Sequence, residues 1–177
     1  MPIWERVSVS LALDTPWLKV LRKTFKRPLD GTTDDYITVE RDDFVLLVVW
    51  YGEKLVLVEQ FRHATERSYL ALPAGYVGSN ESIEAAATRE IQEETGIRIT
   101  SWRRIGTLDP LPGYVKSAAH VLWARSQSPP VSQGDDEVDR VLMLPREDVK
   151  KLITSGRLNE MQAVAAILLA EAMIEES

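Results

Sequence analysis

Two long apolar runs dominate the pattern of hydrophobic and polar positions. FVLLVVW at residues 44–50 is continuously apolar, and KLVLVEQF at residues 54–61 follows it after the short connection YGE. Runs of this length, rich in Val and Leu, indicate buried β-strands, and the short connection predicts a hairpin. LALPAGYVG at residues 70–78 predicts a further short strand followed by a glycine-rich loop.

After this loop the apolar residues take on helical spacing. Ile83, Ala87 and Ile91 recur every four residues, while Asn80 and Gly96 suit the N-cap and the C-terminal end of a helix. Strands interleaved with helices predict an α/β (α+β) domain, in which helices cover a mixed β-sheet. The further elements that the pattern predicts are strands near 97–108, 118–125 and 138–144 and helices at 145–156 and 159–176.

Composition and charge narrow the class of protein. The 177 residues are 45% hydrophobic, which suits a globular domain, and the net charge of −6 comes without a basic block that would bind nucleic acid. There is no cysteine, so we expect neither disulfides nor a thiolate nucleophile, and two distant histidines argue against a histidine-rich zinc site. No apolar run reaches the roughly 18 residues of a membrane span, and the N-terminus lacks a signal-peptide pattern. We therefore expect a cytoplasmic protein.

The stretch TREIQEETG, Thr88–Gly96, places three glutamates on the predicted helix. Glu90 precedes Glu93 by three residues and Glu94 by four, so the three side chains occupy neighbouring parts of one helix face. Arg89 can pair with Glu93 but supplies only one positive charge. A hard divalent cation, Mg²⁺ or Mn²⁺, would balance the remaining charge through oxygen ligands. The alternative is a solvated helix face with an Arg–Glu pair.

The wider spacing favours the metal site. Gly75 is followed after five residues by Glu81 and after seven more by REIQEETGI at residues 89–97. This string resembles the Nudix box, G-x5-E-x7-R-E-U-x-E-E-x-G-U with U an aliphatic residue, and it matches every fixed position. The resemblance implies the Nudix fold and a metal-dependent pyrophosphohydrolase that cleaves nucleoside diphosphates linked to another group.

The resemblance also implies roles for single residues. Glu90 and Glu94 would be the main metal ligands, and Glu93 would be a further ligand or would act through water. The backbone carbonyl of Ala74 would join them, and Arg89 would orient the carboxylates. A divalent ion would clamp the phosphoryl oxygens, and a carboxylate would serve as general base toward the attacking water.

Two residues are candidates for that base. The segment SQGDDEVDRVLMLPREDV, residues 132–149, resembles the acidic loop that precedes a strand in ADP-ribose pyrophosphatases. Glu137 matches the position in this loop that often serves as the base, and Glu93 is the alternative. A solvated acidic loop without a catalytic role would have the same sequence character.

The flanks of the box resemble the ADP-ribose pyrophosphatase group more narrowly. Arg62 matches an arginine that reaches the substrate phosphates, although a surface arginine at a strand end would look the same. Pro112 lies where this group has a proline. Trp17 and Tyr36 match aromatic residues that sandwich the adenine in some members, with core or dimer packing as the alternative. Lys116 departs from the group, because many members carry acidic residues at that point, and this leaves the sugar specificity open.

These resemblances define the expected organisation and activity. Residues 1–42 would form a small N-terminal β-region that builds a homodimer, and residues 43–177 would form the Nudix domain. The expected reaction is hydrolysis of a nucleoside diphosphate sugar, ADP-ribose to AMP and ribose 5-phosphate, with Mg²⁺ or Mn²⁺. The alternatives are GDP-mannose or another nucleotide sugar or dinucleotide as substrate, a nucleotide-pool or RNA-cap hydrolase, and a non-catalytic Nudix ligand-sensing domain. We expect no nucleic-acid or membrane partner.

Overall fold

The computed structural model describes residues 3–131 and 138–175, which fall into two compact units. The first unit contains residues 3–43 and 109–118, and the second contains residues from Phe44 to Leu108 and from Ala119 onward. Of the helices in the described residues, none combines the length and the apolar character that crossing a bilayer requires.

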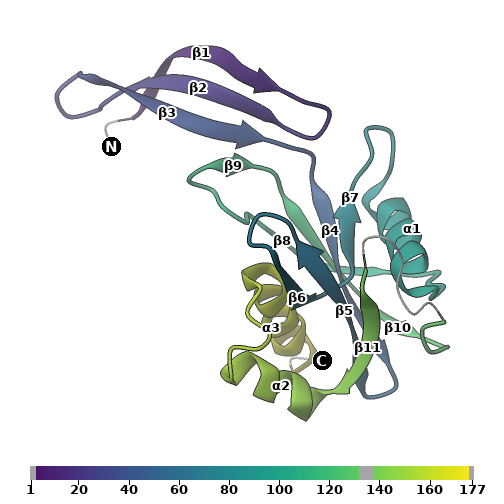
Figure 1. Ribbon diagram of the computed structural model, residues 1–177. Coiled ribbons are helices and arrows are strands. Elements are labelled where there is room, and N and C mark those ends of the chain that lie inside the picture. Colours follow the sequence, from purple (N-terminus) through teal and green to yellow (C-terminus); the bar gives the residue numbers. More distant parts are fainter. Residues whose placement is uncertain (1–2, 132–137, 176–177) are drawn as a thin grey trace. The chain divides into compact units, whose positions relative to one another are not determined.

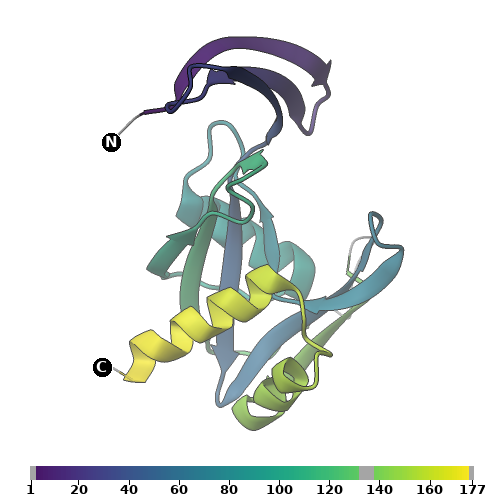
Figure 2. The same cartoon turned by 90° about the vertical axis from the view of Figure 1, so that its left-hand side faces the viewer.

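The first unit is a single layer of β-structure (Figure 2). β1 (Glu5–Asp14), β2 (Lys19–Lys26) and β3 (Thr33–Glu40) are antiparallel neighbours, and the short β9 (Val115–Lys116) pairs in parallel with β3. The strand order is β1-β2-β3-β9, so β1 forms one edge of the sheet and pairs only with β2 within the described residues. The pairing of β1 with β2 is regular over residues 8–11 and shifts register on either side of this stretch.

A mixed sheet lies at the centre of the second unit (Figure 1). Its main path runs β11-β5-β4-β10-β8, while β6 pairs with β5 and β7 pairs with β4. The central strand β4 is parallel to β10 and antiparallel to β5 and β7. The strands are β4 (Phe44–Tyr51), β5 (Lys54–Arg62), β6 (Arg67–Ala71), β7 (Ala74–Tyr76), β8 (Arg103–Leu108), β10 (Ala119–Ser126) and β11 (Arg140–Pro145).

Helices cover both faces of this sheet. α1 (Ile83–Thr95) contributes to one buried apolar cluster, and α3 (Met161–Glu175) contributes with α2 (Arg146–Thr154) to another. Successive residues of β4 alternate between the two: Val45 packs into the α1 cluster and Leu46 into the α3 cluster. Because side chains alternate across a strand, a strand buried on both faces has a continuous apolar sequence.

The predicted α+β class and the mixed sheet between helices are confirmed. The predicted N-cap of α1, Asn80, was wrong. Ser82 caps α1 instead of Asn80, because its Oγ accepts the N–H of Ala85 at 3.1 Å. Gly96 does end the helix, in the left-handed conformation with φ 70°.

The strand predicted over residues 97–108 is shorter than expected. It is confined to β8, which begins only at Arg103. Ile97 and Ile99 instead pack into the α1 cluster from the connection that precedes the strand. Their apolar character therefore reflects burial, which periodicity alone cannot distinguish from strand pairing.

Candidate active site

α1 and β7 bring two of the glutamates together. Ala74 donates its backbone N–H to Oε2 of Glu94 at 3.2 Å. A β-carbon built on the next residue, Gly75, would lie 1.9 Å from Cδ of Glu90. Because Ala74 and Gly75 are adjacent, the two carboxylates lie against the same short strand, one helical turn apart along α1.

Glu94 is the more deeply buried of the two carboxylates. It is 4% exposed, and its Oε1 accepts a hydrogen bond from Nε2 of Gln60 on β5 at 3.1 Å. A buried carboxylate is costly unless donors satisfy its oxygens, and here one donor holds each oxygen. Sequence analysis missed Gln60. The available signal was its polar character on the face of β5 that Val56 and Val58 otherwise keep apolar.

Arg89 connects the acidic residues into one network. Its Nε and Nη2 donate to the two carboxylate oxygens of Glu81 at 3.0 and 2.9 Å. Its Nη1 donates to Glu90 at 2.5 Å and to Glu93 at 3.1 Å, and Nη2 also reaches the carbonyl of Tyr76 at 3.0 Å. The Glu93 pair is the one expected from the sequence, whereas the Tyr76 bond was not foreseen. The carboxylates of Glu81, Glu90 and Glu93, with Glu81 as the largest cause, raise the pKa of Arg89 above its ordinary value.

Glu81 ties the loop before α1 to the helix. Its Oε2 accepts the backbone N–H of Gly78 at 3.1 Å in addition to the Arg89 bonds. The Arg89 guanidinium, and then the Gly78 N–H, hold the pKa of Glu81 below its usual value. Glu81 therefore fixes both the loop and the orientation of the Arg89 fork.

The donor set around Glu90 and Glu94 fits a hard divalent cation, although the protein groups do not form a complete cage. In the described part of the chain, no three His, Cys, Asp or Glu side chains gather closely enough to hold a metal ion by themselves. Mg²⁺ usually binds through one or two carboxylates and takes its remaining oxygens from water and substrate phosphates. Two adjacent carboxylates beside the backbone of Ala74 could supply that share.

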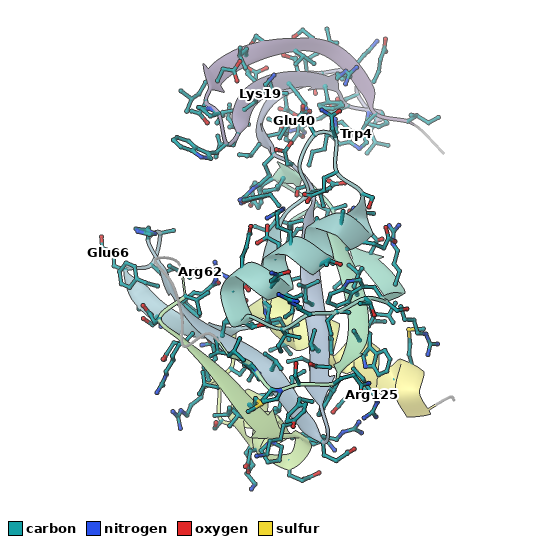
Figure 3. The ribbon with its side chains drawn as sticks, turned by 90° about the vertical axis from the view of Figure 1, so that its right-hand side faces the viewer. Trp4, Lys19, Glu40, Arg62, Glu66 and Arg125 are labelled. Atoms are coloured by element: carbon teal, nitrogen blue, oxygen red, sulfur yellow. The ribbon has the colours of Figure 1, made fainter. Side chains whose placement is uncertain are left out.

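Arg62 ends β5 and follows Gln60 by two residues along the strand. Figure 3 shows Arg62 on the β5–β6 hairpin, whose tip carries Glu66. Nη2 of Arg62 donates to Oε1 of Glu160, the residue before α3, at 2.8 Å. The ion pair holds the guanidinium in place, and Glu160 was not foreseen from the sequence.

The two candidate base-stacking residues both lie in the first unit but line different pockets. Trp17 is 77% exposed and borders a pocket of about 310 Å³ whose lining includes Lys19, Glu40 and Lys116. Figure 3 shows Lys19 and Glu40, which are register partners on β2 and β3. Lys116, the residue that departs from the ADP-ribose group, lies 3.6 Å from the Glu40 carboxylate.

Tyr36 belongs to a separate aromatic pocket of about 270 Å³. Its ring meets those of Trp4 and Phe25 edge to face, with centroids 6.1 and 5.9 Å apart. Pro112 directly precedes Gly113, which lines the same pocket. Trp17 and Tyr36 of one chain therefore do not form the two walls of a single slot. The remaining candidate, Glu137, lies outside the described residues.

Comparison with known proteins identifies the family. The NUDIX domain matches residues 41–164. The ADP-ribose pyrophosphatase of Bacillus subtilis (strain 168) is 31% identical over 125 residues, which cover 69% of this chain and 68% of the relative. The GDP-mannose pyrophosphatase of Klebsiella pneumoniae subsp. pneumoniae is 31% identical over 130 residues, which cover 68% of this chain and 65% of the relative.

A solved structure shares the fold. The crystal structure of an ADP compounds hydrolase matches with a TM-score of 0.84, covering 98% of this chain and 95% of its own at 21% sequence identity. The family match includes both β7 and α1, the two elements that bring Glu90 and Glu94 together. The resemblance to the ADP-ribose pyrophosphatase-like group is thus confirmed, and the chain belongs to the Nudix family as a Nudix hydrolase.

Proposed function

We propose that the protein hydrolyses the diphosphate of a nucleoside diphosphate sugar with the help of Mg²⁺ or Mn²⁺, and that ADP-ribose is its substrate. The observation that carries this proposal is the placement of Glu90 and Glu94 side by side against Ala74 and Gly75. The name of the Bacillus subtilis relative supports the choice of substrate.

The residues of this chain have distinct tasks in the proposal. Glu90 and Glu94 would hold the cation together with the carbonyl of Ala74, and the more exposed Glu93 would reach it directly or through water. When bound, the ion offsets the negative charge of the diphosphate and activates the attacking water. Arg89 keeps the carboxylates in position, since its fork contacts both Glu90 and Glu93.

The substrate and the proton have their own partners. Arg62 binds the phosphates with the N–H groups that Glu160 leaves available. Glu137, with Glu93 as the alternative, accepts the proton of the water as its oxygen attacks phosphorus. The bond to the bridging oxygen then breaks, and AMP and ribose 5-phosphate leave. Trp17 contributes an exposed ring on which the adenine stacks.

GDP-mannose is the second candidate substrate. The Klebsiella pneumoniae relative, a GDP-mannose pyrophosphatase, is as similar in identity as the Bacillus subtilis one. Lys116 lines the same pocket as Trp17, and many ADP-ribose enzymes carry acidic residues at this point of the sequence. We further propose a homodimer formed through residues 1–42, a Nudix domain over residues 43–177 and a cytoplasmic location.

Product analysis with a Glu94→Gln variant tests the proposed activity. The wild-type chain with Mg²⁺ should convert ADP-ribose to AMP and ribose 5-phosphate, as measured by HPLC. E94Q keeps the shape of the side chain but loses its charge, so kcat should fall by roughly a thousandfold. E53Q alters a glutamate whose side chain is 89% exposed in the β4–β5 turn and is the matched control, with unchanged kcat.

The outcomes separate the competing functions. Turnover of GDP-mannose with ADP-ribose ignored would replace the substrate but keep the chemistry. A wild-type chain that binds nucleotide sugars without hydrolysing any of them would favour the ligand-sensing domain. Wild-type kcat in E94Q would contradict the assignment of the cation site.

A further inference from the structure

Two arginines lie opposite each other across the β5–β6 hairpin. Arg62 on β5 and Arg67 on β6 are register partners next to the turn, so their Cα atoms lie about 4.5–5.5 Å apart. Like charges directly opposite each other destabilise an antiparallel pair of strands. Arg62 donates to Glu160 at 2.8 Å, whereas none of the described carboxylates forms an ion pair with Arg67. The two arginines therefore share one carboxylate, and one positive charge of the pair is left unbalanced.

Tyr69 holds the side chain of Arg67 in place. The guanidinium of Arg67 lies over the Tyr69 ring, with Cζ 4.6 Å from the ring centroid, and its Nε donates to the Tyr69 hydroxyl at 2.6 Å. A guanidinium has five N–H groups, one on Nε and four at its end. The terminal groups of Arg67 make no hydrogen bond to the described residues. They present a planar set of donors, which suits a phosphoryl group.

The arginine pair lies near the proposed cation site. Gln60 on β5 donates to the buried Glu94 at 3.1 Å, and the register partner of Gln60 is Tyr69. The arginine pair follows two residues further along the hairpin, a distance of about 6.6 Å. Long side chains at that position can therefore reach phosphoryl groups that are bound next to Glu94.

The alternative is an exposed arginine that stacks on an aromatic ring without binding a ligand. Arg125 on β10 shows this arrangement, because its Cζ lies 5.9 Å from the ring centroid of Trp123. Figure 3 shows Arg125 well apart from Arg62. Arg125 lies 3.9 Å from the carboxylate of Glu53, so it differs from Arg67 in having a carboxylate nearby. Arg67 is further distinguished by the second arginine opposite it.

We infer that Arg67 is a second phosphate-binding residue, and that Arg62 and Arg67 together hold a phosphoryl group of the substrate diphosphate. Tyr69 is then a positioning residue, since it acts through Arg67. Neither Arg67 nor Tyr69 was foreseen from the sequence. The inference rests on the proposed function for its substrate, but anion binding can be measured without hydrolysis. The inference and the proposed function can therefore fail separately.

The kinetics of Arg67→Ala test the inference on the active protein. KM for ADP-ribose should rise about tenfold while kcat changes by less than about twofold, because a contact made equally in the ground state and the transition state affects KM alone. Arg67→Lys keeps the charge but loses the planar fork, so its KM should rise only about threefold. R125A is the matched control and should keep the wild-type values of both constants.

Thermal unfolding with inorganic pyrophosphate tests anion binding without catalysis. In protein freed of divalent ions, pyrophosphate should raise the Tm of the wild type by about 2–4 °C more than sodium chloride of the same ionic strength does. R67A should lose this rise, although its Tm without pyrophosphate should stay close to that of the wild type. R125A should keep the full rise. Y69F retains the ring but not the acceptor for Nε of Arg67, and its rise should be intermediate.

Three results would overturn the inference. The first is R67A with the wild-type KM and the wild-type response to pyrophosphate, which would make Arg67 equivalent to Arg125. The second is a large fall of Tm without pyrophosphate in both R67A and R67K, which would make the role of Arg67 structural. The third is a wild-type chain that pyrophosphate does not stabilise. If the wild type hydrolyses no nucleotide sugar but R67A still loses the pyrophosphate response, the anion site stands and the proposed function is wrong.

Discussion

Glu90 packs so tightly over Gly75 that no side chain fits between them: a β-carbon at position 75 would lie 1.9 Å from Cδ and 2.0 Å from Oε1 of Glu90. The box requires a glycine here because of this close approach. The loop that follows contains Gly78, where a β-carbon would meet Oε2 of Glu81 at an ordinary 3.4 Å. Two glycines of one segment therefore tolerate substitution very differently.

Gly75→Ala should inactivate the enzyme while leaving it folded. The atoms that clash belong to the far end of a flexible side chain, so Glu90 can swing aside at a cost of about 1–3 kcal/mol in the free energy of unfolding. Displacement of Glu90, the proposed cation ligand, should lower kcat by about a hundredfold. Urea unfolding and steady-state kinetics measure the two effects. G78A is the control and should match the wild type in both, whereas wild-type kcat in G75A would contradict the close packing.

Acid should destabilise the protein partly through Glu81. Its pKa in the folded state lies below the ordinary 4.5, so its contribution to stability is present above about pH 4.5 and is lost as the pH falls through the folded-state value. The free energy of unfolding, measured by urea titration from pH 7 to pH 3, should therefore fall less steeply in E81Q than in the wild type. R89A should flatten the same acid limb, because the Arg89 hydrogen bond is the largest cause of the shift. Equal slopes in all three proteins would count against this network.

Arg62 should act mainly on substrate binding. Arg62→Ala removes the proposed phosphate contact, so KM for ADP-ribose should rise about tenfold, which corresponds to roughly 1.4 kcal/mol. E160Q frees the guanidinium and should raise KM less, because Arg62 itself remains. R140A is the matched control. It breaks the ion pair between Arg140 on β11 and Glu59 on β5 and should leave KM unchanged. If R62A and R140A alter KM equally, the role of Arg62 in binding is wrong.

Trp17 and Tyr36 should differ in what they support. Trp17→Ala removes a ring that is 77% exposed, so the free energy of unfolding should change by less than about 0.5 kcal/mol while KM rises about tenfold through lost stacking. Tyr36→Ala removes two edge-to-face contacts, with Trp4 and Phe25, and should cost about 1–3 kcal/mol of stability. Urea unfolding and KM measured on both variants check this. A large rise in KM in Y36A alone would indicate that the adenine binds in the aromatic pocket instead of on Trp17.

Local spacing explains which parts of the site could be predicted. The positions of Glu90, Glu93 and Glu94 on one helix follow from their separation in the sequence, and so does the Arg89–Glu93 pair. The bonds of Gln60 to Glu94 and of Arg62 to Glu160 join residues 34 and 98 positions apart. Such contacts depend on how strands and helices pack, which a single sequence does not display.

The same distinction applies to the fold. The apolar run at residues 44–50 predicted a buried strand, and the turn after it predicted the hairpin between β4 and β5, which pair next to that turn. The sequence did not show that β4 would lie parallel to the distant β10 along its whole length. It also did not show that β4 would take the short β7 as a neighbour, although this pairing delivers Ala74 and Gly75 to the glutamates.

The contacts of Arg89 bear on whether the enzyme needs its metal ion in order to fold. Because Arg89 already pairs with Glu81, Glu90 and Glu93, we expect the chain to fold in a solution that lacks divalent ions. Protein purified in the presence of a chelator should then be folded but inactive. Its activity should return within the mixing time once Mg²⁺ or Mn²⁺ is added. Folding and activation by the metal ion would then be two separate steps. Small zinc domains differ, because they unfold when their metal is removed.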